Sequence, residues 1–271
     1  MSRIGAAFDT FIGMEIISIA MFAALMLAER VLTRRSISGN PPAGRLTDFW
    51  YWTSAPIVRQ LEKWLVASAL AFAAVWLGTS EPSALTAGFG PLSRLPWPLA
   101  ALVAVVVSEF CSYWLHRAMH QVPFLWRFHR IHHSSTTLRW SSAGRTHPVN
   151  EVFNYLAGLF PCLLVGVPLH VVVTLLPVMT MWSVMSHSNQ RWNFGPLRGW
   201  LVSPRFHGWH HTHSSEGGDM NFANILSIFD RLFGTFYMPH DRMPQRFGLD
   251  DTIVPEDYLK QLVLPFQPGD R

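Results

Sequence analysis

Long apolar stretches constrain the fold of this sequence more than any other feature. Residues 11–32, 64–80 and 97–115 are predominantly apolar, and we read each as a helix that crosses a bilayer at about 1.5 Å per residue. The third stretch runs without a break into His116 and His120. We read the first stretch as a retained membrane helix and not as a removed signal peptide, because no cleavage site between small residues stands out near it.

A fourth apolar region, residues 152–186, is too long for one straight span. As a single helix it would extend roughly 50 Å, well beyond the hydrocarbon core of a bilayer. The sequence GVP at 166–168 interrupts this region. We therefore expect a hairpin of two helices, 152–165 and 169–186, that enters and leaves the membrane from the same side.

The composition also favours a membrane protein. Hydrophobic residues make up 49% of the chain and charged residues only 14%, a balance that is unusual for a soluble domain. The 12 Trp and 19 Phe residues fit aromatic belts at the membrane interfaces. The pI is about 9.4, but no stripe of Lys and Arg is interleaved with stacking aromatics, so we expect no nucleic-acid partner.

The distribution of arginine predicts which side of the membrane each segment faces. We expect residues 30–63 to form a loop, and this loop and residues 116–147 are Arg-rich, whereas residues 80–96 contain only Arg94. The positive-inside rule places the Arg-rich segments, and with them every histidine motif, in the cytoplasm. The expected fold is an all-α, polytopic membrane protein with about three spans, a helical hairpin and a cytoplasmic, histidine-rich helical cap.

Three histidine motifs stand out in this apolar chain. They read HRAMH from residue 116, HRIHH from residue 129 and HGWHH from residue 207. On a helix, positions i, i+3 and i+4 share a face, and uncharged imidazole is the commonest metal ligand in proteins. These motifs supply more ligands than one tetrahedral zinc needs, so two metal ions are the economical interpretation. The eight candidate ligands are His116, His120, His129, His132, His133, His207, His210 and His211.

The residues alone leave alternatives open. A histidine-rich surface or a pH sensor would need the same residue type, and imidazole suits Zn, Cu, Fe and Ni alike. No H-E-x-x-H motif is present, so a zincin protease would lack its general base. No E-x-x-H pair is present either, which argues against a soluble ferritin-like di-iron bundle.

The order H-x-x-x-H, H-x-x-H-H, H-x-x-H-H on a membrane scaffold resembles the fatty acid hydroxylase / sterol desaturase superfamily. The run DMNFANILSIFDRLFGTFY at 219–237 is similar to the segment that follows the last histidine box in that family, and RTHP at 145–148 and SHSN at 186–189 resemble it too. The resemblance covers about residues 100–240. It divides the chain into N-terminal membrane helices (1–96), a fatty acid hydroxylase-like di-iron domain (97–240) and a C-terminal tail (241–271).

The resemblance implies a non-haem centre of two iron ions that activates O2 and oxidises a C–H bond of a lipid. The eight histidines named above would be its ligands. His187 would be a ninth, because related acyl-CoA desaturases have an isolated histidine near the end of a membrane helix before the last box. Electrons would come from a ferredoxin, a protein of the cytochrome b5 type or a pteridine.

Other polar residues are candidates for orienting ligands or lining the substrate pocket. Glu109 lies inside the third predicted span, where an ionisable residue is costly, and it would contact either His116 or a neighbouring helix. The alternative for His147 is direct ligation of metal, the alternative for His213 is simple exposure, and the alternative for the rest is ordinary capping and surface salt bridges. The full set is His147, Glu109, Arg145, Asn150, His213, Asp219, Asn221 and Asp230.

The reaction outcome stays open at this point. We favour hydroxylation of a lipid, whereas a lipid or sterol desaturase and an ether-lipid monooxygenase of the alkylglycerol type use the same scaffold. A non-catalytic membrane metal-binding protein is the alternative from another class. It would need metal-coordinating side chains along the spans, where Glu15 and Glu109 are almost the only ionisable residues.

Overall fold

The computed structural model describes residues 16, 19–24, 27, 44–76, 86–249 and 254–267. Within these residues the regular secondary structure consists of α-helices and short 3-10 helices, with two isolated β-bridges. The expectation of an all-α fold is therefore confirmed. The predicted first span, residues 11–32, lies largely outside the described residues.

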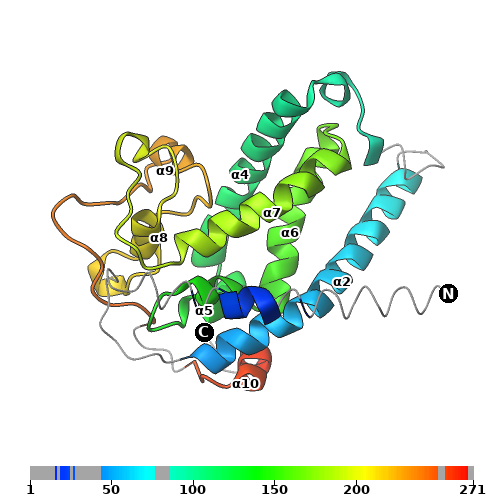
Figure 1. Cartoon of the computed structure of the whole chain (residues 1–271). Coiled ribbons are helices and arrows are strands. Elements are labelled where there is room, and N and C mark those ends of the chain that lie inside the picture. Colours follow the sequence, from blue (N-terminus) through cyan, green and yellow to red (C-terminus); the bar gives the residue numbers. More distant parts are fainter. Residues whose placement is uncertain are drawn as a thin grey trace.

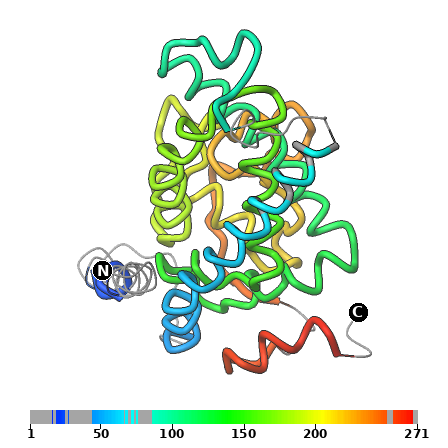
Figure 2. Tube along the Cα trace, turned by 90° about the vertical axis from the view of Figure 1, so that its right-hand side faces the viewer, coloured from blue at the N-terminus to red at the C-terminus, as the bar shows by residue number. Residues whose placement is uncertain are grey.

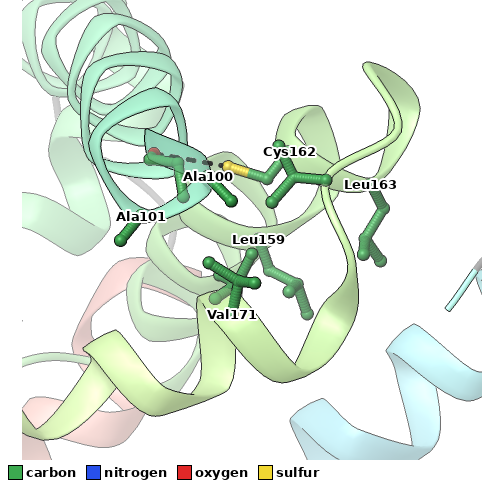
Figure 3. Packing of buried hydrophobic residues seen from close by; sticks show 9 residues of the cluster. Ala100, Ala101, Leu159, Cys162, Leu163 and Val171 are labelled. Atoms are coloured by element: carbon green, nitrogen blue, oxygen red, sulfur yellow. Dashed lines mark hydrogen bonds between the residues drawn. The ribbon is translucent and has the colours of Figure 1, made fainter. Parts of the chain in front are cut away.

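Four long helices form the body of the molecule (Figure 1). They are α2 (Arg45–Trp76), α4 (Trp97–Gln121), α6 (Pro148–Leu164) and α7 (Leu169–Ser186). Helix α4 packs against α6 through small residues, because Ala100 and Ala101 belong to the same buried cluster as Leu159 and Cys162 (Figure 3). Small side chains let two helix backbones approach closely, which is the usual way that helices pack in a membrane.

One of the three predicted spans and one helix of the predicted hairpin are long and apolar enough to cross a membrane. Among the described residues, α4 and α7 are the two helices that are long and apolar enough to cross a membrane. Helix α4 begins at Trp97, as predicted, and continues to Gln121, so it carries the first histidine motif on its last turns. The coarser prediction of membrane-crossing helices therefore agrees with the structure.

The predicted break in the fourth apolar region is also confirmed. Helix α6 ends at Leu164 and α7 begins at Leu169. Gly166 makes the turn with a φ of +93°, and a Cβ atom there would lie 2.3 Å from the carbonyl oxygen of Phe89. Only glycine adopts this conformation in so tight a space.

The prediction of a loop over residues 30–63 is wrong for residues 45–63, which are helical. Helix α2 includes them, so residues 64–76 of the predicted span are the C-terminal part of a longer helix. Asp48, Tyr51, Trp52 and Glu62 are buried, and their spacing follows the i, i+3, i+4 pattern of one helix face. The polar residues that suggested a loop belong instead to an amphipathic helix.

The other described elements, apart from η2, form a cap at the end of the body where α4 and α7 terminate (Figure 1). A second core holds the cap together around Tyr113, Phe206, Trp209 and Phe222. Figure 2 shows the C-terminal helix, drawn in red, beside the first turns of α2. The elements of the cap and its connections are α5 (Pro123–His133), η3 (Trp140–Gly144), η4 (Gly195–Leu197), α8 (Pro204–His210), η5 (Ser214–Glu216), α9 (Ile228–Leu232), α10 (Tyr258–Val263) and η6 (Leu264–Phe266). The short helix η2 (Pro91–Arg94) directly precedes α4 at the opposite end of that helix.

Candidate metal centre

The ends of four helices bring nine histidines together. Helix α4 contributes two from its last turns, α5 contributes three, α8 and its C-cap contribute three, and His187 caps the C-terminus of α7. Two residues fix the start of the short helix α8. Pro204 occupies its first turn, and the Ser203 hydroxyl caps the helix by accepting from the backbone N–H of Phe206 at 3.2 Å.

The nine histidines form two separate groups. Within each group the candidate ligand atoms lie within 4.8 Å of one another. The groups are neighbours, since the His133 and His211 rings stack across them with centroids 4.4 Å apart. Site A consists of His116, His120, His129, His133 and His210, and site B consists of His132, His187, His207 and His211.

Most of these imidazoles donate a hydrogen bond from Nδ1 to an acceptor outside the groups. A neutral imidazole carries one N–H, so a ring that donates from Nδ1 presents a lone pair at Nε2. The bonds run from His116 to the Phe222 carbonyl (2.7 Å), from His187 to the Ser183 carbonyl (2.7 Å), from His210 to the Met220 carbonyl (2.7 Å), from His129 to Asn150 Oδ1 (2.8 Å), from His120 to Asp219 Oδ1 (2.9 Å) and from His132 to the Arg145 carbonyl (3.2 Å).

The Nε2 atoms then face one another inside each site. His116 Nε2 and His129 Nε2 are 3.1 Å apart, and His132 Nε2 and His187 Nε2 are 3.2 Å apart. Because all four rings donate from Nδ1, each pair brings two lone pairs together, an arrangement that a cation between them stabilises. The donor set therefore fits a metal ion in each site.

Burial keeps the imidazoles of the cap in the form that binds metal. It lowers the pKa of His129, His132 and His133 well below the ordinary value, and neighbouring histidines lower these pKa values further. The pKa of His187 falls to about 4, chiefly through burial. These rings are neutral at pH 7, and neutral imidazole is the metal-ligating form.

Three of the residues proposed to orient ligands lie where that role requires. Asp219 accepts from His120, and Asn150 accepts from His129. Asp230 accepts from the backbone N–H groups of Phe222 (2.7 Å) and Ala223 (2.9 Å). It thereby fixes the Phe222 carbonyl, which accepts the hydrogen bond from His116 Nδ1. Such outer contacts fix the tautomer and the direction of a ligating ring.

Asn221 supports the cap through its backbone contacts. Its Nδ2 donates to the carbonyls of Phe206 (3.0 Å) and Tyr237 (2.7 Å), and its Oδ1 accepts from Tyr237 N (2.7 Å). It adopts a φ of +63°, which asparagine tolerates better than most residues. It therefore ties α8 to the segment after α9.

Arg145 and His147 are engaged with other parts of the chain. The buried Arg145 guanidinium donates to Asp48 (2.8 Å) and Glu256 (3.3 Å), so the contact of Arg145 with the histidines is its backbone carbonyl. His147 Nδ1 accepts from Val149 N at the start of α6, and its Nε2 donates to the Leu262 carbonyl. Both nitrogens of His147 are thus taken by backbone groups.

His213 and Glu109 also receive definite positions. His213 Nδ1 lies 2.8 Å from the Ser215 hydroxyl, near the surface of the cap. Glu109 Oε2 accepts from the backbone N–H groups of Ile225 (2.7 Å) and Leu226 (3.0 Å). Glu109 therefore contacts neither His116 nor a neighbouring helix, the two partners considered from the sequence, but the non-helical segment that precedes α9.

A cavity of about 320 Å³ leads to both sites. Side chains of α2, α4, α6 and α7 line it. Sequence reasoning missed the contribution of α2, which includes Tyr51 and Trp52, although the helical spacing of their buried positions was a usable signal. Five of the nine histidines also line the cavity, namely His116, His129, His132, His187 and His207.

Comparisons with known proteins agree with this geometry. A protein-family model described as fatty acid hydroxylase matches residues 101–235. The chain is 32% identical over 199 residues to the ornithine lipid hydroxylase OlsE of Rhizobium tropici, covering 70% of this chain and 60% of that protein. It is 28% identical over 224 residues to alkylglycerol monooxygenase of Homo sapiens, covering 82% of this chain and 47% of that protein. No solved structure matches the chain.

A third relative, alkylglycerol monooxygenase of Caenorhabditis elegans, is 27% identical over 179 residues, covering 64% of this chain and 34% of that protein. The chain therefore spans 60% or less of the length of each of these three relatives. All nine histidines of the two sites fall within the part of the chain that the family model matches.

Proposed function

The chain belongs to the fatty acid hydroxylase family, and from this membership we propose that it is a membrane-bound lipid hydroxylase with two iron ions. Site A would hold one ion with up to five imidazoles, and site B would hold the other with four. An all-imidazole donor set suits several transition metals, and the family membership is the reason for choosing iron.

One observation carries the proposal. Buried, neutral imidazoles face each other through Nε2 lone pairs at the end of a cavity that is large enough to admit part of a lipid. A histidine-rich surface or a pH sensor would expose its rings to water, whereas eight of these nine side chains are buried. The non-catalytic metal-binding alternative gives no reason for a cavity that leads to the ligands.

Iron ions held in these sites would supply the activation of O2 that oxidises a C–H bond. The residues of the chain provide the rest. Outer acceptors such as Asp219 and Asn150 hold the rings in one orientation. Apolar side chains in the cavity wall, including Leu159, Val172 and Leu176, would hold the alkyl part of the lipid and keep water out.

The remaining features of the proposal come from the sequence. We propose a multi-pass arrangement with the histidines on the cytoplasmic side, because the Arg-rich segments lie there under the positive-inside rule. An external electron donor would be a ferredoxin, a protein of the cytochrome b5 type or a pteridine. The chain carries no flavin or dinucleotide fingerprint of its own.

Ether-lipid cleavage is a second candidate function. It starts with the same hydroxylation, on the carbon next to the ether oxygen, after which the hemiacetal collapses. The similarity to human alkylglycerol monooxygenase over 82% of this chain favours it. Desaturation has no comparable support among the relatives described above.

Lipid analysis tests the proposal. Lipid extracts from cells with and without the protein would be compared by mass spectrometry, and we expect a species that has gained one oxygen atom, or the products of ether cleavage. His132→Ala should abolish the change, since it removes a ligand of site B. His170→Ala, which alters an exposed histidine outside both sites, should retain it.

Three results would contradict the proposal. A product that has lost two hydrogens would instead indicate a desaturase. Firmly bound metal without O2 uptake under any donor would favour a metal-binding protein. If cells with His132→Ala made the same oxidised lipid as cells with the wild type, the lipid change would not depend on the histidine sites.

A further inference from the structure

Glu109 offers the cavity a polar atom that the protein itself does not use. The side chain lies on α4, is only 1% exposed and lines the cavity. Its Oε2 accepts two backbone hydrogen bonds from the 225–226 segment. Its Oε1 is buried and has no hydrogen-bond partner within the described part of the chain.

An unpartnered buried acceptor is costly, because it has lost its water without gaining a protein donor. No metal ligand compensates it, since His116 lies two helical turns, about 10 Å, further along α4. Glu109, Ser112 and His116 nevertheless form one stripe on α4, and all three line the cavity. The side chain that carries the unused oxygen is therefore part of the wall that leads to the histidines.

Asn150 adds an independent observation on a second helix of the cavity wall. Its side chain, on α6, is 1% exposed and also lines the cavity. Its Oδ1 accepts from His129, while its Nδ2 is buried without a hydrogen-bond partner among the described residues. The cavity thus contains an unused acceptor on one helix and an unused donor on another.

A plain hydrocarbon chain in this cavity would exclude water and leave both atoms unpaired. A polar lipid group would pair at least one of them, and enzymes whose sites form such bonds discriminate strongly against substrates that lack the matching group. Further polar side chains of the wall, such as Asn154 and Thr180, fit the same kind of ligand.

We propose that Glu109 is a specificity-determining residue that accepts a hydrogen bond from a hydroxyl or amide N–H of the lipid. The carbon to be oxidised then lies near the polar part of the lipid, about two helical turns from this contact, and not near the methyl end of a long chain. This inference rests on the proposed function of the histidine sites as a lipid hydroxylase.

The substitution Glu109→Gln isolates the effect of the unpartnered oxygen. The backbone N–H groups of Ile225 and Leu226 require an oxygen, so the new amide places its oxygen toward them and its NH2 group toward the cavity. The contact that holds the 225–226 segment is kept, while the atom in the place of Oε1 changes from an acceptor to a donor. A substrate hydrogen that bonds Oε1 in the wild type meets another donor in the variant.

The test measures binding of two matched probes to purified protein in detergent, namely a 1-O-hexadecylglycerol and its di-O-methyl ether, which lacks both hydroxyl hydrogens. We expect the wild type to bind the hydroxyl-bearing probe about tenfold more tightly than the capped probe. In Glu109→Gln the ratio of the two dissociation constants should fall to near one, and the melting temperature should not change.

Glu62→Gln is the matched control. Glu62 is also a buried carboxyl, 2% exposed, with an unpartnered Oε1, but it is not among the residues that line the cavity. This variant should keep the wild-type preference. The inference would be overturned if Glu109→Gln kept the preference for the hydroxyl-bearing probe. It would also be overturned if the wild type bound the two probes equally tightly, or bound neither.

The proposed function has its own readout. Gain of oxygen by a cellular lipid, together with its loss in His132→Ala, does not depend on Glu109. A wild type that oxidises lipids but ignores the hydroxyl groups of the probes would leave the hydroxylase proposal intact and reject the role of Glu109.

Discussion

Asp230 fixes the orientation of His116 without touching it. The carboxylate of Asp230 accepts from Phe222 N, and the carbonyl of Phe222 receives the hydrogen bond from His116 Nδ1. The backbone of a single residue therefore connects a buried acid to a ring of site A. Acids that act in this indirect way are as important to a site as the residues that would bind the metal.

Asp230→Asn should weaken both the fold and site A. The amide replaces one acceptor by a donor in front of backbone N–H groups, so we expect the free energy of unfolding to fall by about 2–3 kcal/mol and metal affinity to fall about tenfold. Thermal unfolding and competition with a chelator measure the two effects. Asp241→Asn, at an exposed position, should change neither.

Asp219→Asn should affect the metal more than the fold. The Asp219 side chain is 76% exposed and accepts from His120, and its φ is +59°, a conformation that asparagine also adopts. We expect about a tenfold loss of metal affinity at site A with an unchanged melting temperature. Equal affinity in the variant and the wild type would show that His120 needs no carboxylate.

The metal-free protein should lose stability as the pH falls below about 6.5. Unfolded histidines take up protons near that pH, whereas burial lowers the pKa of His187 to about 4 and those of His129, His132, His207 and His211 well below the ordinary value. Between these values the unfolded state binds more protons, so each ring removes up to about 1.4 kcal/mol of stability per pH unit.

Denaturant titrations of the metal-free protein at pH 7.5 and pH 5 check this dependence. The loss of stability should be smaller in a variant that replaces two of the buried rings, such as His207→Gln with His211→Gln. Stability that is constant from pH 7 to pH 5 would contradict the placement of these rings in the interior.

Gly166→Ala should destabilise the hairpin between α6 and α7. The new Cβ atom would meet the backbone carbonyl of Phe89 at 2.3 Å, and the φ of +93° is unfavourable for alanine. We expect a loss of about 2–4 kcal/mol, seen as a lower melting temperature. Gly158→Ala is the matched control, because it lies within α6 with no atom near the added Cβ, and it should be neutral or slightly stabilising.

The sequence motifs predicted which histidines gather but not how they divide. The i, i+4 pairs stay together, since His129 and His133 belong to site A while His207 and His211 belong to site B. The remaining residue of each motif, His132 or His210, joins the other site. Helical spacing alone shows a shared face, and only the packing of α5 against its neighbours decides which members of that face meet.

Other features depend on contacts that no residue pattern displays. The acceptors for His116 and His187 are backbone carbonyls, which any residue type provides. The N-terminal half of α2 was missed because its charges suggested a loop, whereas Asp48 is buried against Arg145, nearly a hundred positions away along the chain. Long-range pairing of this kind appears only in the folded protein.

The division of ligands among helices has a consequence for the biogenesis of the protein. Helices α5 and α8 each supply rings to both sites, so neither site has its full set until residues 204–211 have been synthesised and docked. On the proposed function, metal loading would be a late step in maturation, and stoichiometric metal in a purified sample would indicate that α8 has docked against α4, α5 and α7.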